Sequence, residues 1–433
     1  MEIKRDVYLD RLIVRKHNGL IKVITGIRRS GKSYLLNTLF YRHLIAENIS
    51  EDHIIKFAFD SAEDLLKIGE DPIVLDNEKE DRKVDPSKFI NWLMPQIKGD
   101  GMYYLLLDEV QKLGAFESVL NGFLRRENLD VYVTGSNSKF LSKDVLTEFR
   151  GRGDEVHVLP LSFSEYYTFK QGDKSEAYDD YSVYGGLPAV ALMVTEEQKT
   201  NYLISQMQNL YLRDIVNRYA VQDETALGKV IDVIASGIST LTNPRKIANT
   251  MNTIHGTKTC DATVDRYIGY AEEAFILTRV KRYNVKGRKY IGTPYKIYFE
   301  DVGLRNVRLS FRQIEGTHMM ENIIYNELRY RGYQVDVGTV ESREKDSSGK
   351  EIRVQREIDF IASLGSKKYY IQSAYAIPDQ EKYEQETKSF EHTMDSFKKI
   401  IIIEKSMKPR YDEHGYLMMG VKEFLLDANS LLI

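Results

Sequence analysis

The chain has 433 residues, which at roughly 150 residues per domain is enough for about three domains. Charged residues make up 29% and apolar residues 42% of it, and 61 basic against 64 acidic residues leave a net charge of −3. This composition excludes a wholly disordered chain. It also excludes global charge attraction to nucleic acid or membrane, so such binding requires a local patch.

Cys260 is the only cysteine, which excludes an intrachain disulfide and a cysteine-based zinc site. The first residues, Met1–Asp6, lack the apolar run of a signal peptide. No apolar stretch approaches the roughly 18 residues that a membrane span needs. We therefore expect a cytoplasmic protein that has no membrane partner.

Residues 20–165 alternate between strand and helix patterns. Short apolar runs predict strands at 20–24, 53–59, 103–107, 131–134 and 156–159. Apolar residues at helical spacing predict a helix over 33–47. Strands that alternate with helices are typical of a doubly wound parallel sheet, so we expect an α/β fold. The acidic stretch 60–85 shows little periodicity and predicts a surface insertion.

After residue 165 the pattern changes twice more. Residues 166–235 are helical in pattern and predict a lid or linker. Residues 236–310 predict helix, turn, helix and hairpin, the layout of a winged helix. Residues 311–433 predict a small α/β domain. We therefore predict four domains, with the first at 1–165.

Residues 26–33 read Gly-Ile-Arg-Arg-Ser-Gly-Lys-Ser, the complete P-loop pattern, between a predicted strand and a predicted helix. The glycines let backbone N–H groups turn around phosphate oxygens, and the helix dipole assists. Lys32 is expected to reach the β- and γ-phosphates and Ser33 to ligate magnesium. The predicted ligands are ATP and Mg²⁺. The predicted nucleotide-binding residues are Gly26, Arg28, Arg29, Ser30, Gly31, Lys32, Ser33 and Tyr34.

An apolar run at 105–107 ends in Asp108 and Glu109 and resembles a Walker B strand. Such a strand places carboxylates at the carboxyl edge of the sheet, where ligands bind. Asp108 is expected to hold magnesium through water, and Glu109 to act as general base toward the attacking water.

Two further catalytic groups are predicted downstream. The fourth strand leads into Ser136 and Asn137, which fit either a sensor for the γ-phosphate or a helix cap. Arg152, rather than Arg150, is our candidate arginine finger. An arginine at this position can alternatively be solvated or form a surface salt bridge. A finger that acts on a neighbouring subunit implies a homo-oligomer, whereas one acting within its own chain does not.

Together these motifs resemble the prokaryotic AAA-superfamily ATP-binding proteins, which join an N-terminal ATPase domain to a C-terminal region of unknown function. The resemblance is also carried by the segments 159–165, 184–188, 298–306, 356–360 and 370–372. It covers almost the whole chain. It implies ATP binding and hydrolysis on a P-loop NTPase fold, and makes residues 1–165 the ATPase domain.

The last predicted domain is similar to the restriction-endonuclease-like fold. Active nucleases of that fold use a helix acid, a strand Asp and a following Glu/Gln-x-Lys to gather magnesium. The similarity implies Glu321 or Glu327 as helix acid, Asp359 as strand acid and Gln372 as the next ligand, but Ala374 stands at the lysine position. We therefore expect a retained fold without cleavage.

The predicted hairpin of the winged helix is strongly basic. Its basic residues are Arg279, Lys281, Arg282, Lys286, Arg288 and Lys289. Such a hairpin can bind nucleic-acid phosphates. It can equally be a solvated edge that prevents sheet pairing, or a protein contact.

Three functions remain open at this point. The first is a magnesium-dependent ATPase coupled to a nucleic-acid or protein partner. The second is an ATP-dependent switch or DNA-binding module with little turnover. The third is a metal-dependent nuclease, which requires Lys367 or Lys368 to replace the missing lysine.

Overall fold

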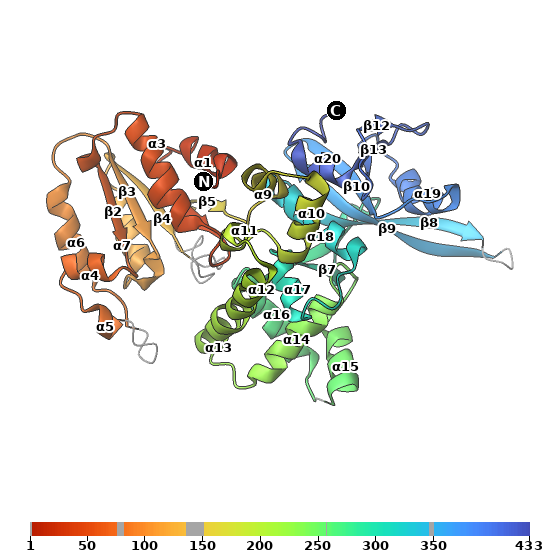
Figure 1. Ribbon diagram of the computed structural model, residues 1–433, viewed down its shortest axis with the longest axis horizontal. Coiled ribbons are helices and arrows are strands. Elements are labelled where there is room, and N and C mark those ends of the chain that lie inside the picture. The colour runs from red at the N-terminus through yellow and green to blue at the C-terminus, as the bar shows by residue number, and fades with distance from the viewer. Residues whose placement is uncertain (1, 76–81, 136–150, 257, 346–349) are drawn as a thin grey trace. The chain divides into compact units, whose positions relative to one another are not determined.

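The computed structural model describes residues 2–75, 82–135, 151–256, 258–345 and 350–433 (Figure 1). The chain folds into two compact units. We call Ile3–Leu159 with Glu273–Phe275 the N-terminal unit, and Pro160–Glu272 with Ile276–Ile433 the C-terminal unit. In the part of the chain that is described, no helix has the length and apolar character needed to cross a membrane.

The N-terminal unit is built on a five-stranded sheet. Its strands are β1 (Ile21–Thr25), β2 (Ile54–Ala58), β3 (Tyr103–Asp108), β4 (Leu129–Thr134) and β5 (Gly153–His157). The strand order is β2-β3-β4-β1-β5, and every neighbouring pair is parallel. The strand β4 therefore lies between β3 and β1, and the carboxyl ends of these three strands are adjacent at one edge.

Helices cover both faces of this sheet. They are α1 (Asp6–Ile13), α2 (Lys32–Tyr34), α3 (Tyr41–Ala46), α4 (Ala62–Lys67), α5 (Pro72–Leu75), α6 (Pro86–Leu93) and α7 (Phe116–Phe123), with a π-helical segment, Leu35–Phe40, joining α2 to α3. Because side chains alternate across a strand, each strand contributes to two cores. Leu105 and Leu107 of β3 belong to one core with Phe89 of α6. On the other face Phe40 packs against Tyr132 of β4, with ring centroids 4.5 Å apart.

These elements confirm the predicted α/β class and the doubly wound parallel sheet. The first four strands lie where the sequence predicts them, with ends shifted by one or two residues. The last was predicted at 156–159 but runs from Gly153 to His157. It is an edge strand that starts with polar, partly exposed residues, so its first half carries no apolar signal.

The stretch 60–85 was predicted to be a surface insertion, and for its described part this is wrong. Leu65, Ile68 and Val84 are buried in the core that packs on β3. Val84 also exchanges backbone hydrogen bonds with Lys112 and Gly114. The apolar residues are too sparse along this stretch to give a periodic signal, yet they are enough to fasten it to the unit.

The C-terminal unit begins with helices and ends in a sheet. Its helices are α9 (Phe163–Lys170), α10 (Lys174–Tyr184), α11 (Pro188–Leu192), α12 (Glu196–Ser205), α13 (Arg213–Tyr219), α14 (Glu224–Ser236), α15 (Pro244–His255), α16 (Asp261–Glu273), α17 (Val302–Arg308), α18 (Gly316–Tyr330), α19 (Gln380–Thr387) and α20 (Val421–Leu426). Its strands are β6 (Leu277–Asn284), β7 (Lys289–Phe299), β8 (Gln334–Lys345), β9 (Glu351–Leu364), β10 (Lys367–Ala374), β11 (Lys398–Ile403), β12 (Arg410–Tyr411) and β13 (Leu417–Gly420).

These strands form one mixed sheet in the order β12-β13-β11-β10-β9-β8-β6-β7. The hairpin β6–β7 joins the sheet through parallel pairing of β6 with β8. The hairpin predicted for the winged helix and the strands predicted for the last domain are thus hydrogen-bonded in one sheet. The four domain boundaries stay predictions.

A buried carboxylate fixes the turn at 184–188 against α17. Asp301, 1% exposed, accepts hydrogen bonds from the backbone N–H of Gly186 at 2.8 Å and of Leu304 at 3.0 Å. Burial raises the pKa of Asp301 to about 6. Gly303 lies so close to the carbonyl of Tyr184 that a Cβ would collide with it. Two segments that carry the family resemblance are therefore in direct contact.

Replacing Asp301 by Ala should lower the free energy of unfolding of the C-terminal unit by about 2 kcal/mol, because it removes the cap of α17 and leaves a buried N–H unpaired. Urea denaturation measures the loss. The control is Asp179→Ala, an exposed carboxylate on α10, which should change stability by less than about 0.5 kcal/mol. Equal midpoints for the two variants would contradict this account.

Candidate functional site

The P-loop connects the end of β1 to the start of α2. Lys32, 4% exposed, is the first residue of the helix. Its Nζ donates to the carbonyls of Gly26 and Ile27, both at 2.9 Å. The ammonium therefore lies inside the loop, where the P-loop pattern requires it.

The backbone of the loop depends on two supports. Gly26 has a φ of 133°, in the region that favours glycine, and a Cβ there would meet the carbonyl of Val158. Arg5, 3% exposed, donates to the carbonyls of Ser30 at 3.0 Å and of Leu159 at 2.7 Å. Arg5 lies far from the loop in sequence, so no motif spacing points to it.

The carboxyl end of β3 lies beside the P-loop helix. Asp108 Oδ1 accepts from the Thr134 hydroxyl at the end of β4, and Oδ2 accepts from Asn37 Nδ2 at 3.1 Å. The Ser33 hydroxyl lies close enough to the Asp108 carboxyl group to influence its pKa. Burial raises the pKa of Asp108, the Thr134 and Ser33 hydroxyls oppose the rise, and nearby Glu109 adds to it. The two predicted magnesium ligands, Ser33 and Asp108, therefore lie near each other.

Glu109 leaves the sheet in a left-handed backbone conformation, with a φ of 52°. This conformation is uncommon for a residue other than glycine and concentrates at functional sites. Its N–H donates to Thr134 Oγ1 at 3.1 Å, and its carboxylate accepts from Gln111. Burial and then Glu109 raise the pKa of Asp60, so a second acid lies close by. The sequence did not single out Asp60, Asn37 or Thr134 as site residues.

The remaining P-loop residues differ in exposure. Arg28 is half-buried, and Arg29 and Tyr34 are exposed. Ser30 is fully buried, and Gly31 takes a φ of 95°. The predicted sensor residues Ser136 and Asn137, together with Arg150, lie outside the described residues.

Arg152 lies where the parallel strands β1 and β5 begin. Its carbonyl accepts from the N–H of Ile21, the first residue of β1, and it immediately precedes β5. The P-loop follows the carboxyl end of β1. Because the strands are parallel, Arg152 and the P-loop therefore lie at opposite ends of the strands. The structure therefore does not bring Arg152 to the P-loop of its own chain, and a role as arginine finger stays a prediction for a neighbouring copy.

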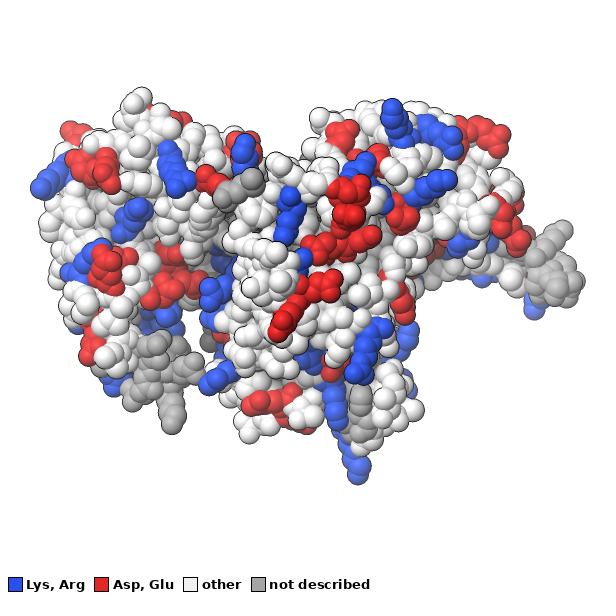
Figure 2. Space-filling model, in the orientation of Figure 1, with Lys and Arg blue, Asp and Glu red and all other residues white. Residues whose placement is uncertain are grey.

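The basic hairpin divides into two parts. Arg279 is paired with Glu272 and Asp265, each at 2.5 Å. Arg282, 7% exposed, donates to the carbonyls of Pro294 and Thr293 and to Gln355. These two residues serve the fold, which corrects their assignment to a nucleic-acid surface. The exposed members are Lys281, Lys286, Arg288 and Lys289. On the face shown in Figure 2, basic and acidic side chains are interspersed.

The predicted nuclease acids are only partly brought together. Glu321, Asp359 and Gln372 are buried near one another, whereas Glu327 is paired with Arg331 at 2.7 Å. Lys368 lies over the rings of Tyr283 and Phe397, and Lys367 is exposed. The lysine that reaches the acids is Lys296 of β7, which the sequence did not suggest.

Asp108→Asn should melt no lower than wild type at about pH 8 without nucleotide, because burial disfavours the carboxylate that it removes. A carboxyl group whose pKa is raised by folding lowers the stability of the folded protein only at a pH at which it is ionised. Any gain in Tm from Asp108→Asn should therefore shrink as the pH falls toward about 3.9, the ordinary pKa of an aspartate. Thermal melting across pH measures this, with the exposed Asp100→Asn as control. A variant that melts several degrees lower at about pH 8 would contradict it.

A sequence model of an AAA domain matches residues 18–167, and a model of a domain of unknown function matches residues 175–315. The chain is 34% identical over 410 residues to an uncharacterised protein of Haemophilus influenzae, covering 93% of this chain and 94% of that protein. An uncharacterised protein of Methanocaldococcus jannaschii is 26% identical over 446 residues, covering 98% of this chain and 89% of that one.

Among solved structures, Cdc6p from Pyrobaculum aerophilum has a TM-score of 0.31 at 11% identity, covering 75% of this chain and 96% of that one. This score is too low to bear on function. The AAA-domain match confirms the superfamily predicted from the motifs, while the winged helix and the endonuclease-like domain stay predictions. The chain is an AAA-superfamily protein, and it belongs to the same family as the Haemophilus influenzae protein.

Proposed function

We propose that the chain is a magnesium-dependent ATPase that binds and hydrolyses ATP at the P-loop of the N-terminal unit. One observation carries the proposal: a buried lysine, a serine and a carboxylate gather at one sheet edge. They are Lys32 and Ser33 at the start of the helix and Asp108 at the end of β3. A structural glycine turn would need neither the ammonium nor the carboxylate.

Lys32 binds the phosphates in this proposal. In the structure its ammonium donates to the carbonyls of Gly26 and Ile27. A phosphate oxygen carries negative charge, so it attracts the Lys32 ammonium more strongly than a neutral carbonyl does. Lys32 therefore transfers from these carbonyls to the β- and γ-phosphates, while N–H groups of the loop and helix surround them.

Ser33 and Asp108 fit a magnesium ion. Both offer oxygen, the ligand atom that Mg²⁺ prefers, and they lie near each other. The Asp108 carboxylate is buried and has a raised pKa, so a cation beside it would favour its ionised form. Magnesium, when bound there, neutralises charge on the β- and γ-phosphates. Asn37 and Thr134 orient Asp108 toward that position.

Glu109 is the proposed general base. Its left-handed backbone turns the residue away from the strand direction immediately after Asp108. The Thr134 hydroxyl holds its N–H. From there its carboxylate accepts a proton from the attacking water. We further propose Asn137 as the γ-phosphate sensor and Arg152 as a finger for a neighbouring copy, which requires a homo-oligomer.

We propose nucleic acid as the partner, bound by the exposed hairpin residues. Three helices, α14 to α16, precede the hairpin, and Thr242 before α15 pairs with Tyr295 of β7, an arrangement that supports a winged helix. Lys286, Arg288 and Lys289 lie exposed at the turn between β6 and β7. A basic hairpin end of this kind contacts phosphates without reading sequence.

Lys32→Ala should lower magnesium-dependent phosphate release roughly hundredfold or more, because it removes the cation that stabilises the developing charge. The matched control, Lys67→Ala at an exposed position of α4, should retain wild-type turnover. Unimpaired turnover in a purified Lys32→Ala protein that melts like wild type would refute the proposal.

Glu109→Gln separates an ATPase from an ATP-dependent switch. An ATPase with Glu109 as base should lose turnover in this variant while still binding ATP. A switch with negligible turnover should behave alike with and without the substitution. Phosphate release and nucleotide retention, measured on the same preparation, distinguish the two.

Replacing Lys286, Arg288 and Lys289 together by Ala should weaken binding to duplex DNA at least roughly tenfold at physiological salt, and flatten the salt dependence by roughly 0.9 per lost contact. The control removes the same charge elsewhere, at the exposed residues Lys405, Lys408 and Arg410. Equal losses in both triple variants would indicate general charge attraction, and no loss in the first would exclude the hairpin.

A further inference from the structure

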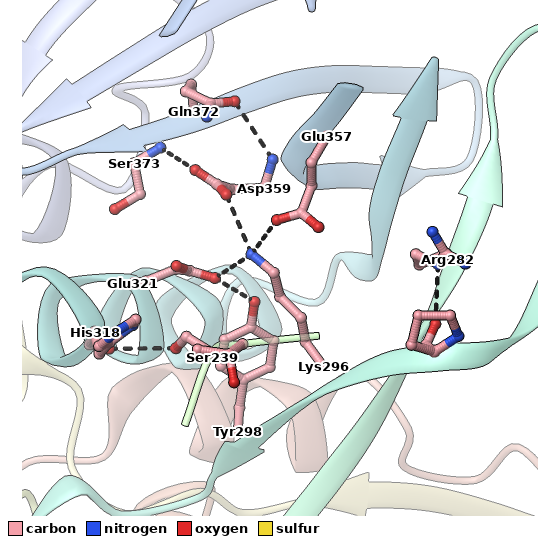
Figure 3. A network of polar contacts seen from close by, with 12 residues as sticks. Ser239, Arg282, Lys296, Tyr298, His318, Glu321, Glu357, Asp359, Gln372 and Ser373 are labelled. Carbon is pink, nitrogen blue, oxygen red and sulfur yellow. Dashed lines mark hydrogen bonds and ion pairs between the residues drawn. The ribbon is translucent and has the colours of Figure 1, made fainter. Parts of the chain in front are cut away.

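Three acidic side chains of the C-terminal unit surround a single lysine. Lys296 Nζ, from β7, lies 2.8 Å from Glu321 of α18, 2.7 Å from Glu357 and 3.2 Å from Asp359, both of β9 (Figure 3). Lys296 and Glu321 are 3% and 6% exposed. This cluster includes the acids that the endonuclease resemblance assigns to magnesium.

The number of N–H donors on the Lys296 ammonium matches the number of carboxylates around it. Lysine has three N–H donors and no acceptor, and here it meets one oxygen from each of three carboxylates. Burial lowers the pKa of Lys296, but the carboxylates outweigh it and hold the pKa well above its ordinary value. Lys296 therefore remains a cation, at the point where the three acids converge.

Several of the remaining acceptor positions around the acids are also taken. Tyr298 donates its hydroxyl to the same Glu321 oxygen at 2.6 Å, and the N–H of Ser373 donates to Asp359 Oδ2 at 2.8 Å (Figure 3). Gln372, the next expected metal ligand, accepts from the Asp359 N–H and donates its amide to Glu386. Both the oxygen and the nitrogen of the Gln372 side-chain amide therefore already have hydrogen-bond partners.

A divalent ion does not fit this arrangement. Mg²⁺ needs about six oxygen ligands at about 2.0–2.1 Å, several of them usually water. At the centre of these carboxylates it would lie against the Lys296 ammonium, a charge of the same sign. Across the described residues, no three His, Cys, Asp or Glu side chains are grouped so as to hold a metal ion.

We infer that Lys296 takes the place of the divalent cation in this fold, so that the C-terminal unit is held together by an internal ammonium and does not use a metal. The same acids become candidate ligands for a divalent ion only once the ammonium is removed. Removing the ammonium should leave Glu321, Glu357 and Asp359 short of a cation, and a divalent ion is the simplest replacement. This inference is independent of the ATPase activity proposed for the N-terminal unit.

The test compares wild type, Asp359→Asn, Lys296→Met and Lys296→Met/Asp359→Asn as nucleotide-free whole chains. Mn²⁺ is the probe, read by thermal melting and by calorimetric titration. All four share the same P-loop, so a difference between them reports on the acid cluster. Lys422→Met is the matched control, since Lys422 is also buried and pairs with one carboxylate, Glu404, at 2.9 Å.

We expect wild type to show no Mn²⁺ binding that depends on Asp359. Lys296→Met should have a lower Tm, which millimolar Mn²⁺ raises by several degrees through one new site per chain. The double variant should lose that rescue, and Lys422→Met should lose stability without gaining a metal site.

Two results would overturn the inference. One is Mn²⁺ binding by wild type that Asp359→Asn abolishes. The other is a folded Lys296→Met protein whose Tm does not respond to Mn²⁺. If Lys296→Met does not fold unaided, refolding from urea should succeed with Mn²⁺ and fail in EDTA, and failure in both overturns the inference as well.

Discussion

The buried carboxylate of Asp108 is the point on which the N-terminal unit depends. The strand order places Thr134 of β4 beside it, and the P-loop helix presents Ser33 and Asn37, four residues apart on one face, to the same group. Glu109 then turns out of the sheet next to it. The helix after the P-loop, β3 and β4 therefore meet at this carboxylate.

Two buried lysines have opposite environments in this chain. Lys32 is held by carbonyls of its own loop, acceptors that a phosphate can replace. Lys296 is held by three carboxylates that already provide the negative charge a cation seeks. The first arrangement favours recruiting an anionic ligand, whereas the second is complete within the fold. In the proposed function, lysine therefore binds a ligand in one unit, whereas in the other it holds elements of the fold together.

The sequence predicted features whose physical basis is local. Buried parallel strands are continuous apolar runs, and the P-loop is a contiguous motif, so both were found at nearly their true positions. The contacts of Arg5, Asn37 and Thr134 join residues far apart in the chain, and no spacing encodes them. The contact of Lys296 with these acids was not predicted, because Lys296 belongs to a hairpin that was assigned to another domain, while its partners lie on α18 and β9. Arg152 was identified by its neighbours in sequence, but the parallel sheet sets it at the edge opposite to the P-loop.

Calorimetric titration of a non-hydrolysable ATP analogue tests the central claim most directly, with and without magnesium, on wild type and Lys32→Ala. The account predicts one site per wild-type chain, tighter with magnesium, and an affinity at least roughly tenfold weaker in Lys32→Ala. Absence of binding to wild type, or equal affinity in both proteins, would contradict the assignment of this P-loop as an ATP site.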